Sequence, residues 1–113
     1  GFIQGAGWLT IEEVNWKSNG ELTTHSPSTY KIPAVNDMPE KFNVEIFKNI
    51  NKENTVNKSK TTGEPPLMLA MSVFFAIKDA IASVGNYTII PELNAPATPE
   101  AILLSINNIK SKL

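Results

Sequence analysis

The stretch Ser59–Ser83, SKTTGEPPLMLAMSVFFAIKDAIAS, decides how this chain folds. Its centre, Leu67 to Ile77, is apolar except for Ser72, and charges return only at Lys78 and Asp79. A helix with apolar side chains on every side must be buried on every side. The run is shorter than the roughly 18 apolar residues of a bilayer span, so we predict a core helix and no membrane segment. A chain of this size can hardly surround such a helix, which predicts a partner surface outside it.

The start of this helix is where catalytic chemistry is expected. Proline is favoured at the first helical position, so Pro65 and Pro66 set the helix start at Gly63 or Glu64. A residue before proline is pushed toward extended backbone, which turns the Glu64 side chain away from the helix body. In a dry, apolar site Glu64 would become a general base near neutral pH. At the surface it would only complement the helix dipole.

The length and amino-acid composition are typical of a single globular domain. The chain has 113 residues, with hydrophobic residues at 42% and charged residues at 19%. A net charge of -1 gives no electrostatic footprint for nucleic acid or for an acidic membrane surface. The absence of cysteine excludes disulfides and thiolate ligands and fits a reducing compartment, and a single histidine leaves no ordinary zinc or iron site. Because the chain begins without Met inside a glycine-rich apolar pattern, we expect it to be cut from a longer protein.

The remaining patterns predict an α+β unit with about three helices and a few short strands. Residues 42–47, FNVEIF, alternate apolar and polar side chains, as a half-buried strand does. Thr98, Pro99 and Glu100 form a helix start with a cap, a proline and a dipole-complementing carboxylate. We expect the helices in residues 1–16, 64–84 and 98–113, and the strands in residues 14–17, 21–24, 42–47 and 87–90. Gly85 is expected just past the end of the central helix.

The first predicted helix contains three glycines that need compensation. Gly1, Gly5 and Gly7 each cost a helix about 1 kcal/mol relative to Ala. The usual reason for such glycines is the close approach of another backbone or of a ligand. Gln4 lies among them, with an amide that both donates and accepts hydrogen bonds. His25 lies in the polar segment THSPS and is expected to be an exposed loop residue.

Five motifs in order along the chain resemble the C-terminal segment of the molybdenum-binding subunit or domain of the xanthine dehydrogenases, which are molybdenum hydroxylases. The resemblance covers nearly the whole chain. Its motifs are SKTTGEPPLMLAMSVFFAIKDAI at residues 59–81, FIQG at 2–5, PSTYKIP at 27–33, FNV at 42–44 and APATPE at 95–100. Residues 1–113 would then be a single unit, a fragment of the molybdopterin-binding domain.

This resemblance implies a place for the chain in a molybdenum active site. The family carries out oxidative hydroxylation of hypoxanthine and xanthine toward urate, and a glutamate acts as the general base that activates a hydroxyl on the molybdenum. The matching residue here is Glu64. Gln4 of the F-x-Q-G motif would lie beside the molybdenum–molybdopterin cofactor. Gly63 is a further candidate cofactor contact, because backbone N–H groups before a helix can bind an anion, although simple capping explains the same composition.

The resemblance also implies what lies outside the chain. Iron–sulfur clusters and FAD would be on other domains or subunits, and the rest of the molybdenum-binding subunit would supply most cofactor and purine contacts. We expect a cytoplasmic oxidoreductase of purine catabolism, without nucleic-acid or membrane partners, whose isolated fragment is inactive. Two alternatives stay open. One is an aldehyde oxidase or other molybdenum hydroxylase, and the other is a non-enzymatic α+β interaction module.

Overall fold

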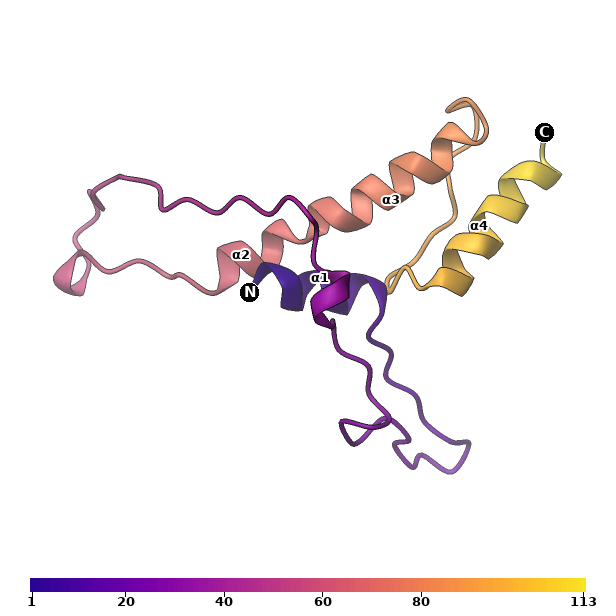
Figure 1. The fold of residues 1–113 in the computed structure, drawn as a ribbon, viewed down its shortest axis with the longest axis horizontal. Coiled ribbons are helices and arrows are strands. Elements are labelled where there is room, and N and C mark those ends of the chain that lie inside the picture. The colour runs from indigo at the N-terminus through magenta and orange to yellow at the C-terminus, as the bar shows by residue number, and fades with distance from the viewer.

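The helices of this chain meet near the middle of an open shape (Figure 1). The computed structural model describes residues 1–113, with extents of 55 × 42 × 28 Å and a radius of gyration of 18.3 Å. A compact domain of 100 residues would have a radius of gyration of about 13 Å. Only 11 of the 113 residues are buried. The chain therefore does not enclose a core of ordinary size.

The structure is built from helices joined by long loops. The elements are α1 (Phe2–Thr10), the 3-10 turns η1 (Val35–Asp37) and η2 (Val56–Lys58), and the helices α2 (Glu64–Leu69), α3 (Met71–Ser83) and α4 (Pro99–Ser111). No strand forms, and the one β-bridge joins Trp16 to Leu22. The predicted helices are present, although the first ends at Thr10 and does not reach Trp16. The chain is helix-rich and lacks the short strands of the predicted α+β fold.

Two of the predicted strands, residues 42–47 and 87–90, fail for physical reasons. Residues 42–47 run through the long loop between η1 and η2 without a neighbouring strand, so Ile46 is 91% exposed and Phe47 83% exposed. A strand without a partner leaves its backbone groups unpaired and is not stable alone. Residues 87–90 begin with a left-handed turn, because φ is 50° at Asn86 and 61° at Tyr87. Both segments lack the second strand that pairing requires.

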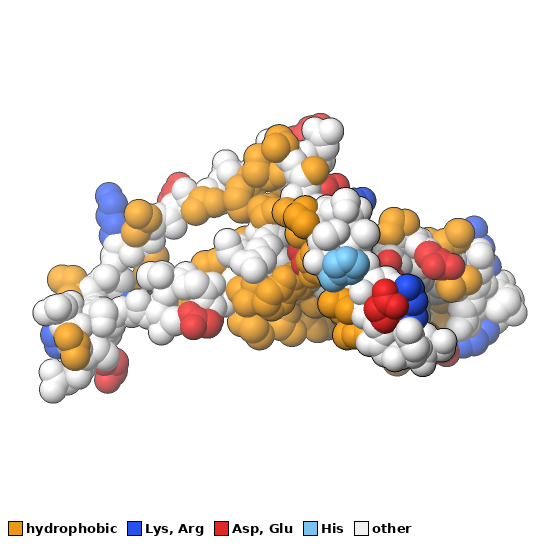
Figure 2. Space-filling model, turned by 90° about the horizontal axis from the view of Figure 1, so that it is seen from below, with side chains coloured by type: hydrophobic (Ala, Val, Ile, Leu, Met, Phe, Trp, Pro, Cys, Tyr) orange, Lys and Arg blue, Asp and Glu red, His pale blue; other side chains and the backbone are white.

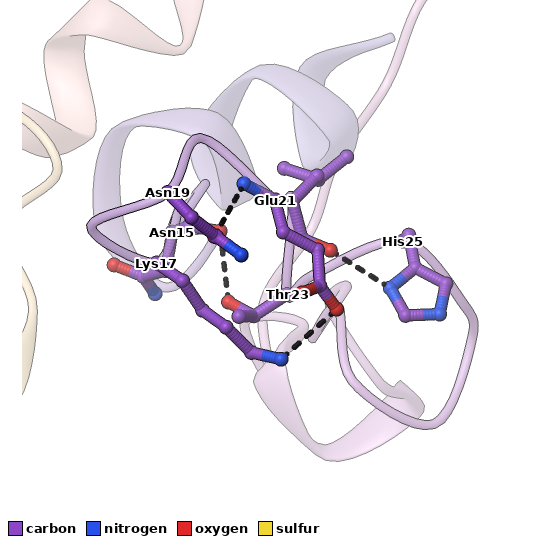
Figure 3. A network of polar contacts seen from close by, with 7 residues as sticks. Asn15, Lys17, Asn19, Glu21, Thr23 and His25 are labelled. Carbon is purple, nitrogen blue, oxygen red and sulfur yellow. Dashed lines mark hydrogen bonds and ion pairs between the residues drawn. The ribbon is translucent and has the colours of Figure 1, made fainter.

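The loop after α1 is held by a short antiparallel pairing and by local polar side-chain contacts (Figure 3). The Lys17 N–H bonds the Glu21 carbonyl and the Thr23 N–H bonds the Asn15 carbonyl, each at 2.9 Å, so the predicted strand pair is reduced to the bridge of Trp16 with Leu22. Lys17 Nζ lies 2.9 Å from Glu21 Oε1, and Thr23 Oγ1 donates to the Asn15 carbonyl at 2.8 Å. Gly20 makes the turn with φ at 84°. His25 is exposed, with Nδ1 3.1 Å from the Leu22 carbonyl oxygen, so the prediction of an exposed loop histidine is confirmed.

The central helix is a rod whose regular α-helical hydrogen bonding is interrupted at one place. The rod, Glu64–Ser83, spans 20 residues and consists of α2 and α3 joined at Ala70. The Ala70 N–H bonds the Leu67 carbonyl at 3.2 Å, a tighter spacing than the α-helical one. By length and mean hydropathy the whole rod meets the criteria of a membrane-spanning helix, whereas its apolar run, Leu67 to Ile77, is shorter than such a span, as the sequence indicated. Length and hydropathy alone are weak grounds for a membrane span, because a core helix of a soluble protein meets the same criteria.

Most of the rod is uncovered, as its all-round apolar character predicted. Only Ala70 and Ile81 are buried along it, whereas Met68, Leu69 and Phe75 are each more than half exposed. Figure 2 shows hydrophobic side chains gathered over the middle of the molecule. A contiguous exposed apolar surface of this kind marks an interaction site in a soluble protein.

The small hydrophobic core lies where α3 meets α4. It consists of Ile81, Leu93, Ala97 and Ile109. Gly85 is buried beside it, and a Cβ there would lie 2.9 Å from Ile109 Cγ2. Gly85 is therefore required for packing. Gly85 lies just past the end of α3, after the C-cap residue Val84, which confirms its predicted position. The left-handed backbone that follows is at Asn86 and Tyr87.

The start of α4 follows the predicted pattern. Thr98 is extended, with φ at -65° and ψ at 160°, and its Oγ1 accepts a hydrogen bond from the Ala101 N–H at 3.2 Å. Pro99 opens the helix and Glu100 lies in its first turn. Local capping signals alone were enough to locate this helix.

Glu92 fastens the end of α4 to the preceding linker, and this contact is expected to weaken in acid. Its carboxylate lies 2.8 Å from Lys112 Nζ and accepts from Asn108 Nδ2 at 3.2 Å. Lys112 lowers the pKa of Glu92 below its ordinary value of 4.5, chiefly through this hydrogen bond and then through its charge. Because the folded state has the lower pKa, the stabilisation is present above pH 4.5 and is lost as the pH falls through the folded pKa.

Thermal unfolding of the intact protein against pH measures this effect. Lys112→Ala should lower stability at pH 7 and should approach the parent protein in strong acid. Lys110→Ala, in the same turn and without an ion pair, is the matched control and should show no pH-dependent difference. Equal pH profiles for the two variants would contradict the assignment.

Candidate functional site

The site predicted from sequence is organised by the contact of α1 with α2, whose first turns lie side by side (Figure 1). A Cβ on Gly1 would lie 3.4 Å from the Gly63 carbonyl oxygen, and a Cβ on Gly5 would lie 2.5 Å from the Leu67 carbonyl oxygen and 2.8 Å from Ala70 Cβ. The glycines of α1 therefore allow close approach of a second helix backbone, which confirms that prediction.

Glu64 is the first residue of α2, as its position before two prolines predicted. Gly63 is the N-cap residue, and no side chain caps the helix. The Glu64 side chain is exposed and makes no hydrogen bond or ion pair within the chain. A carboxylate at this position is favoured by the helix dipole. The dry surroundings that a general base requires are not built by this chain, so residues outside it would have to supply them.

Gly63 leaves open space beside the start of the rod. A Cβ added at Gly63 would meet nothing within 4 Å, and its backbone is already helical, with φ at -84° and ψ at -50°. Backbone conformation therefore does not require glycine at this position. The open space would let another group approach the backbone before Glu64 closely.

Gln4 lies one turn into α1 and is exposed. It lines a cavity of about 440 Å³. The other lining residues are Ile3, Trp8, Glu12, Tyr30, Ile32 and Pro33. Glu64 is not among them, so the structure brings the helices that carry Gln4 and Glu64 together without placing both side chains in one cavity.

The opposite end of this cavity holds a pair that sequence reasoning missed. Glu12 is buried, and the Tyr30 hydroxyl donates a hydrogen bond to Glu12 Oε2. This hydrogen bond raises the pKa of Tyr30 above its ordinary value of 10.0, with smaller contributions from burial and from the Glu12 charge. The only indication of this pair in the sequence was Tyr30 within the motif PSTYKIP, and that motif by itself suggests no chemical role.

A second hollow, of about 730 Å³, lies between the linker and α4. Ser105 lines it, with a buried Oγ that has no hydrogen-bond partner. Charges of both signs, from Glu13, Glu92, Glu100 and Lys78, surround this hollow. It contains none of the residues predicted from sequence. Nowhere do three His, Cys, Asp or Glu side chains cluster as ligands for a metal ion.

Comparison with known proteins gives one consistent result. Residues 1–39 match the family model described as "Molybdopterin cofactor-binding domain". The chain is 47% identical over 107 residues to a xanthine dehydrogenase/oxidase of Felis catus, which covers 89% of the chain. It is 41% identical over 124 residues to a xanthine dehydrogenase of Oryza sativa subsp. japonica, covering 99% of the chain, and 44% identical over 115 residues to xanthine dehydrogenase 1 of Arabidopsis thaliana, covering 92%.

The matched region is a small part of each relative. The chain spans 8% of the Felis catus and Arabidopsis thaliana proteins and 9% of the Oryza sativa protein. The family-model match includes Gln4, Glu12 and Tyr30, whereas Glu64 lies beyond it. The likeness of the region around Glu64 therefore comes from the relatives, which match across nearly the whole chain.

Proposed function

Because the chain belongs to the xanthine dehydrogenase family as a segment of its molybdopterin cofactor-binding domain, we propose that it forms one wall of a molybdenum hydroxylase active site. The observation that carries this proposal is the unpaired Glu64 carboxylate at the start of a rod whose apolar surface is largely uncovered. A base of this kind needs a dry site, and an apolar rod needs a covering surface. The remainder of such a domain would supply both.

The residues at this end of the rod fit a large anionic cofactor. Gly63 leaves room for a close approach, and the Gln4 amide on α1, the helix packed against α2, can both donate and accept hydrogen bonds. When bound, the molybdenum cofactor supplies the oxygen-transfer and redox chemistry. Glu64 would accept a proton at a carboxylate oxygen, which is the role of a general base. Gln4 and Gly63 hold the cofactor in place through the amide and the backbone.

The proposed reaction is the oxidative hydroxylation of hypoxanthine and xanthine toward urate. The names of the relatives support a purine substrate. Iron–sulfur clusters and FAD on other parts of the protein carry the electrons away, and the whole protein is a cytoplasmic enzyme of purine catabolism. An aldehyde oxidase would use the same residues. The exposed rod also favours one non-enzymatic candidate, a helical interaction module, which would not require Glu64.

The isolated segment of residues 1–113 is expected to contain no molybdenum and to show no xanthine turnover. Its Glu64 is exposed, and most of the rod has no covering surface, so the dry cofactor site is incomplete. Metal analysis and a xanthine oxidation assay on the purified segment test this expectation. Stoichiometric molybdenum or measurable turnover would contradict it.

A further inference from the structure

One face of α1 and the last residues of the segment Ser26–Pro33, namely Tyr30, Ile32 and Pro33, form the two walls of a single cavity. Gln4 and Trp8 lie four residues apart on the same side of α1, and Glu12 lines the same cavity from just beyond the end of the helix. Tyr30 and the residues after it face them across the cavity of about 440 Å³. Gln4 therefore shares one space with the pair formed by Glu12 and Tyr30.

The Glu12 carboxylate has one strong partner. The residue is 8% exposed, it forms no ion pair within the chain, and its one side-chain hydrogen bond comes from the Tyr30 hydroxyl. A buried carboxylate is costly unless hydrogen bonds satisfy it. Both backbones are fixed locally, because the Glu12 N–H bonds the Gly7 carbonyl at 3.0 Å and the Tyr30 N–H bonds the Ser26 carbonyl at 2.9 Å. The side-chain bond therefore joins two ordered segments.

Gly7 shows how closely the two segments are fitted. A Cβ at Gly7 would lie 2.4 Å from Glu12 Oε1 and 2.5 Å from Pro33 Cγ. The helix thus rests directly on the proline and on the carboxylate, with no space for a methyl group. A change in the Glu12–Tyr30 bond would be passed to α1 through this contact, because close-packed groups transmit displacement.

We infer that the hydrogen bond between Tyr30 and Glu12 is a positioning contact that fixes α1 on the segment Ser26–Pro33 and so sets the orientation of Gln4. This inference rests on the proposed cofactor contact of Gln4. Glu12 and Tyr30 touch no reacting atom themselves. They act through α1, and their effect on the reaction passes through Gln4.

A double-mutant cycle in the intact, cofactor-loaded protein tests the inference. Tyr30→Phe and Gln4→Ala should each lower kcat about tenfold with little change in KM. The double variant should also lose about tenfold, because two residues that act through one contact are not additive. Tyr30→Phe should also raise the hydrogen exchange of the α1 amides. Glu12→Gln keeps an acceptor for the tyrosine hydroxyl, so it should retain the kcat and exchange of the parent protein.

Tyr87→Phe is the matched control, since Tyr87 is 64% exposed and lies outside the candidate site. It should change neither kcat nor the exchange of α1. A loss of about a hundredfold in the double variant, or unchanged α1 exchange in Tyr30→Phe, would overturn the inference. If the effects of Tyr30→Phe and Gln4→Ala are additive while Glu64→Gln still loses its turnover, only this inference fails and the proposed function stands. If Gln4→Ala and Glu64→Gln both keep full turnover, the inference and the proposed function are overturned together.

Discussion

Replacing Glu64 with Gln in the intact protein is expected to lower kcat about 10²–10⁴-fold while the molybdenum content stays the same. Glutamine keeps the size of the side chain but cannot accept the proton. The exposed Glu64 side chain makes no hydrogen bond or ion pair within the chain, so the substitution should not disturb the packing of this segment. Steady-state xanthine oxidation and metal analysis on the same preparation give the two values needed.

Glu100→Gln is the matched control for this experiment. Glu100 is also an exposed glutamate next to a proline in the first turn of a helix, so both substitutions remove a dipole-complementing charge. Only the Glu64 variant should lose turnover. Full activity in Glu64→Gln would refute the general-base role and would favour the interaction module. Loss of molybdenum in Glu64→Gln would instead assign Glu64 to cofactor retention.

The second large effect is expected at the contact of α1 with α2. Gly5→Ala should destabilise this contact by about 1–3 kcal/mol, as overpacking of a tight interface does. The new Cβ would lie 2.5 Å from the Leu67 carbonyl oxygen, which is backbone and cannot move as a side chain would. Native-state hydrogen exchange of α1 and α2 in the intact protein reports this local stability directly.

Gly63→Ala is the glycine control for folding. A Cβ at Gly63 meets nothing within 4 Å, and its backbone is already helical. Alanine at such a position should leave the hydrogen exchange of α1 and α2 unchanged or slow it, which corresponds to a gain in local stability of up to about 1 kcal/mol. If Gly5→Ala and Gly63→Ala behave alike, the close approach of the two helices is not what holds α1 in place.

Local signals in the sequence predicted the helices well. Pro65 and Pro66 located the start of the rod, and Thr98 with Pro99 located α4, because caps and prolines act within one turn of the residues they affect. The costly glycines of α1 correctly indicated a close neighbour. The exposure of the rod was predictable from its uniform apolar character, because a chain of 113 residues can hardly surround such a helix.

Features that depend on distant partners could not be predicted in this way. The alternation in residues 42–47 describes a strand, but strand formation requires a neighbouring strand that these residues lack. The Glu12–Tyr30 pair joins residues 18 positions apart, with no local pattern to connect them. Gly85 lies past the end of α3 as predicted, but its packing against Ile109 is a tertiary contact that no local pattern reveals.

The candidate site was predicted unevenly. The position of Glu64 at a helix start follows from the prolines after it. Its role, and those proposed for Gln4 and Gly63, came from the family resemblance. Residues 1–39 match a cofactor-binding family model, but nothing in their local chemistry would have identified the ligand. When other parts of a protein complete a site, one segment contains only some of the residues that determine its chemistry.

A structure of the intact protein with its cofactor bound tests the central claim most directly. It should place the Glu64 carboxylate and the Gln4 amide on the same side of the cofactor. Glu64 should lie in a dry pocket, within about 2.6–3.2 Å of the group from which it takes a proton. A Glu64 carboxylate in open solvent, on the side of the rod opposite Gln4 and remote from the cofactor, would contradict the account.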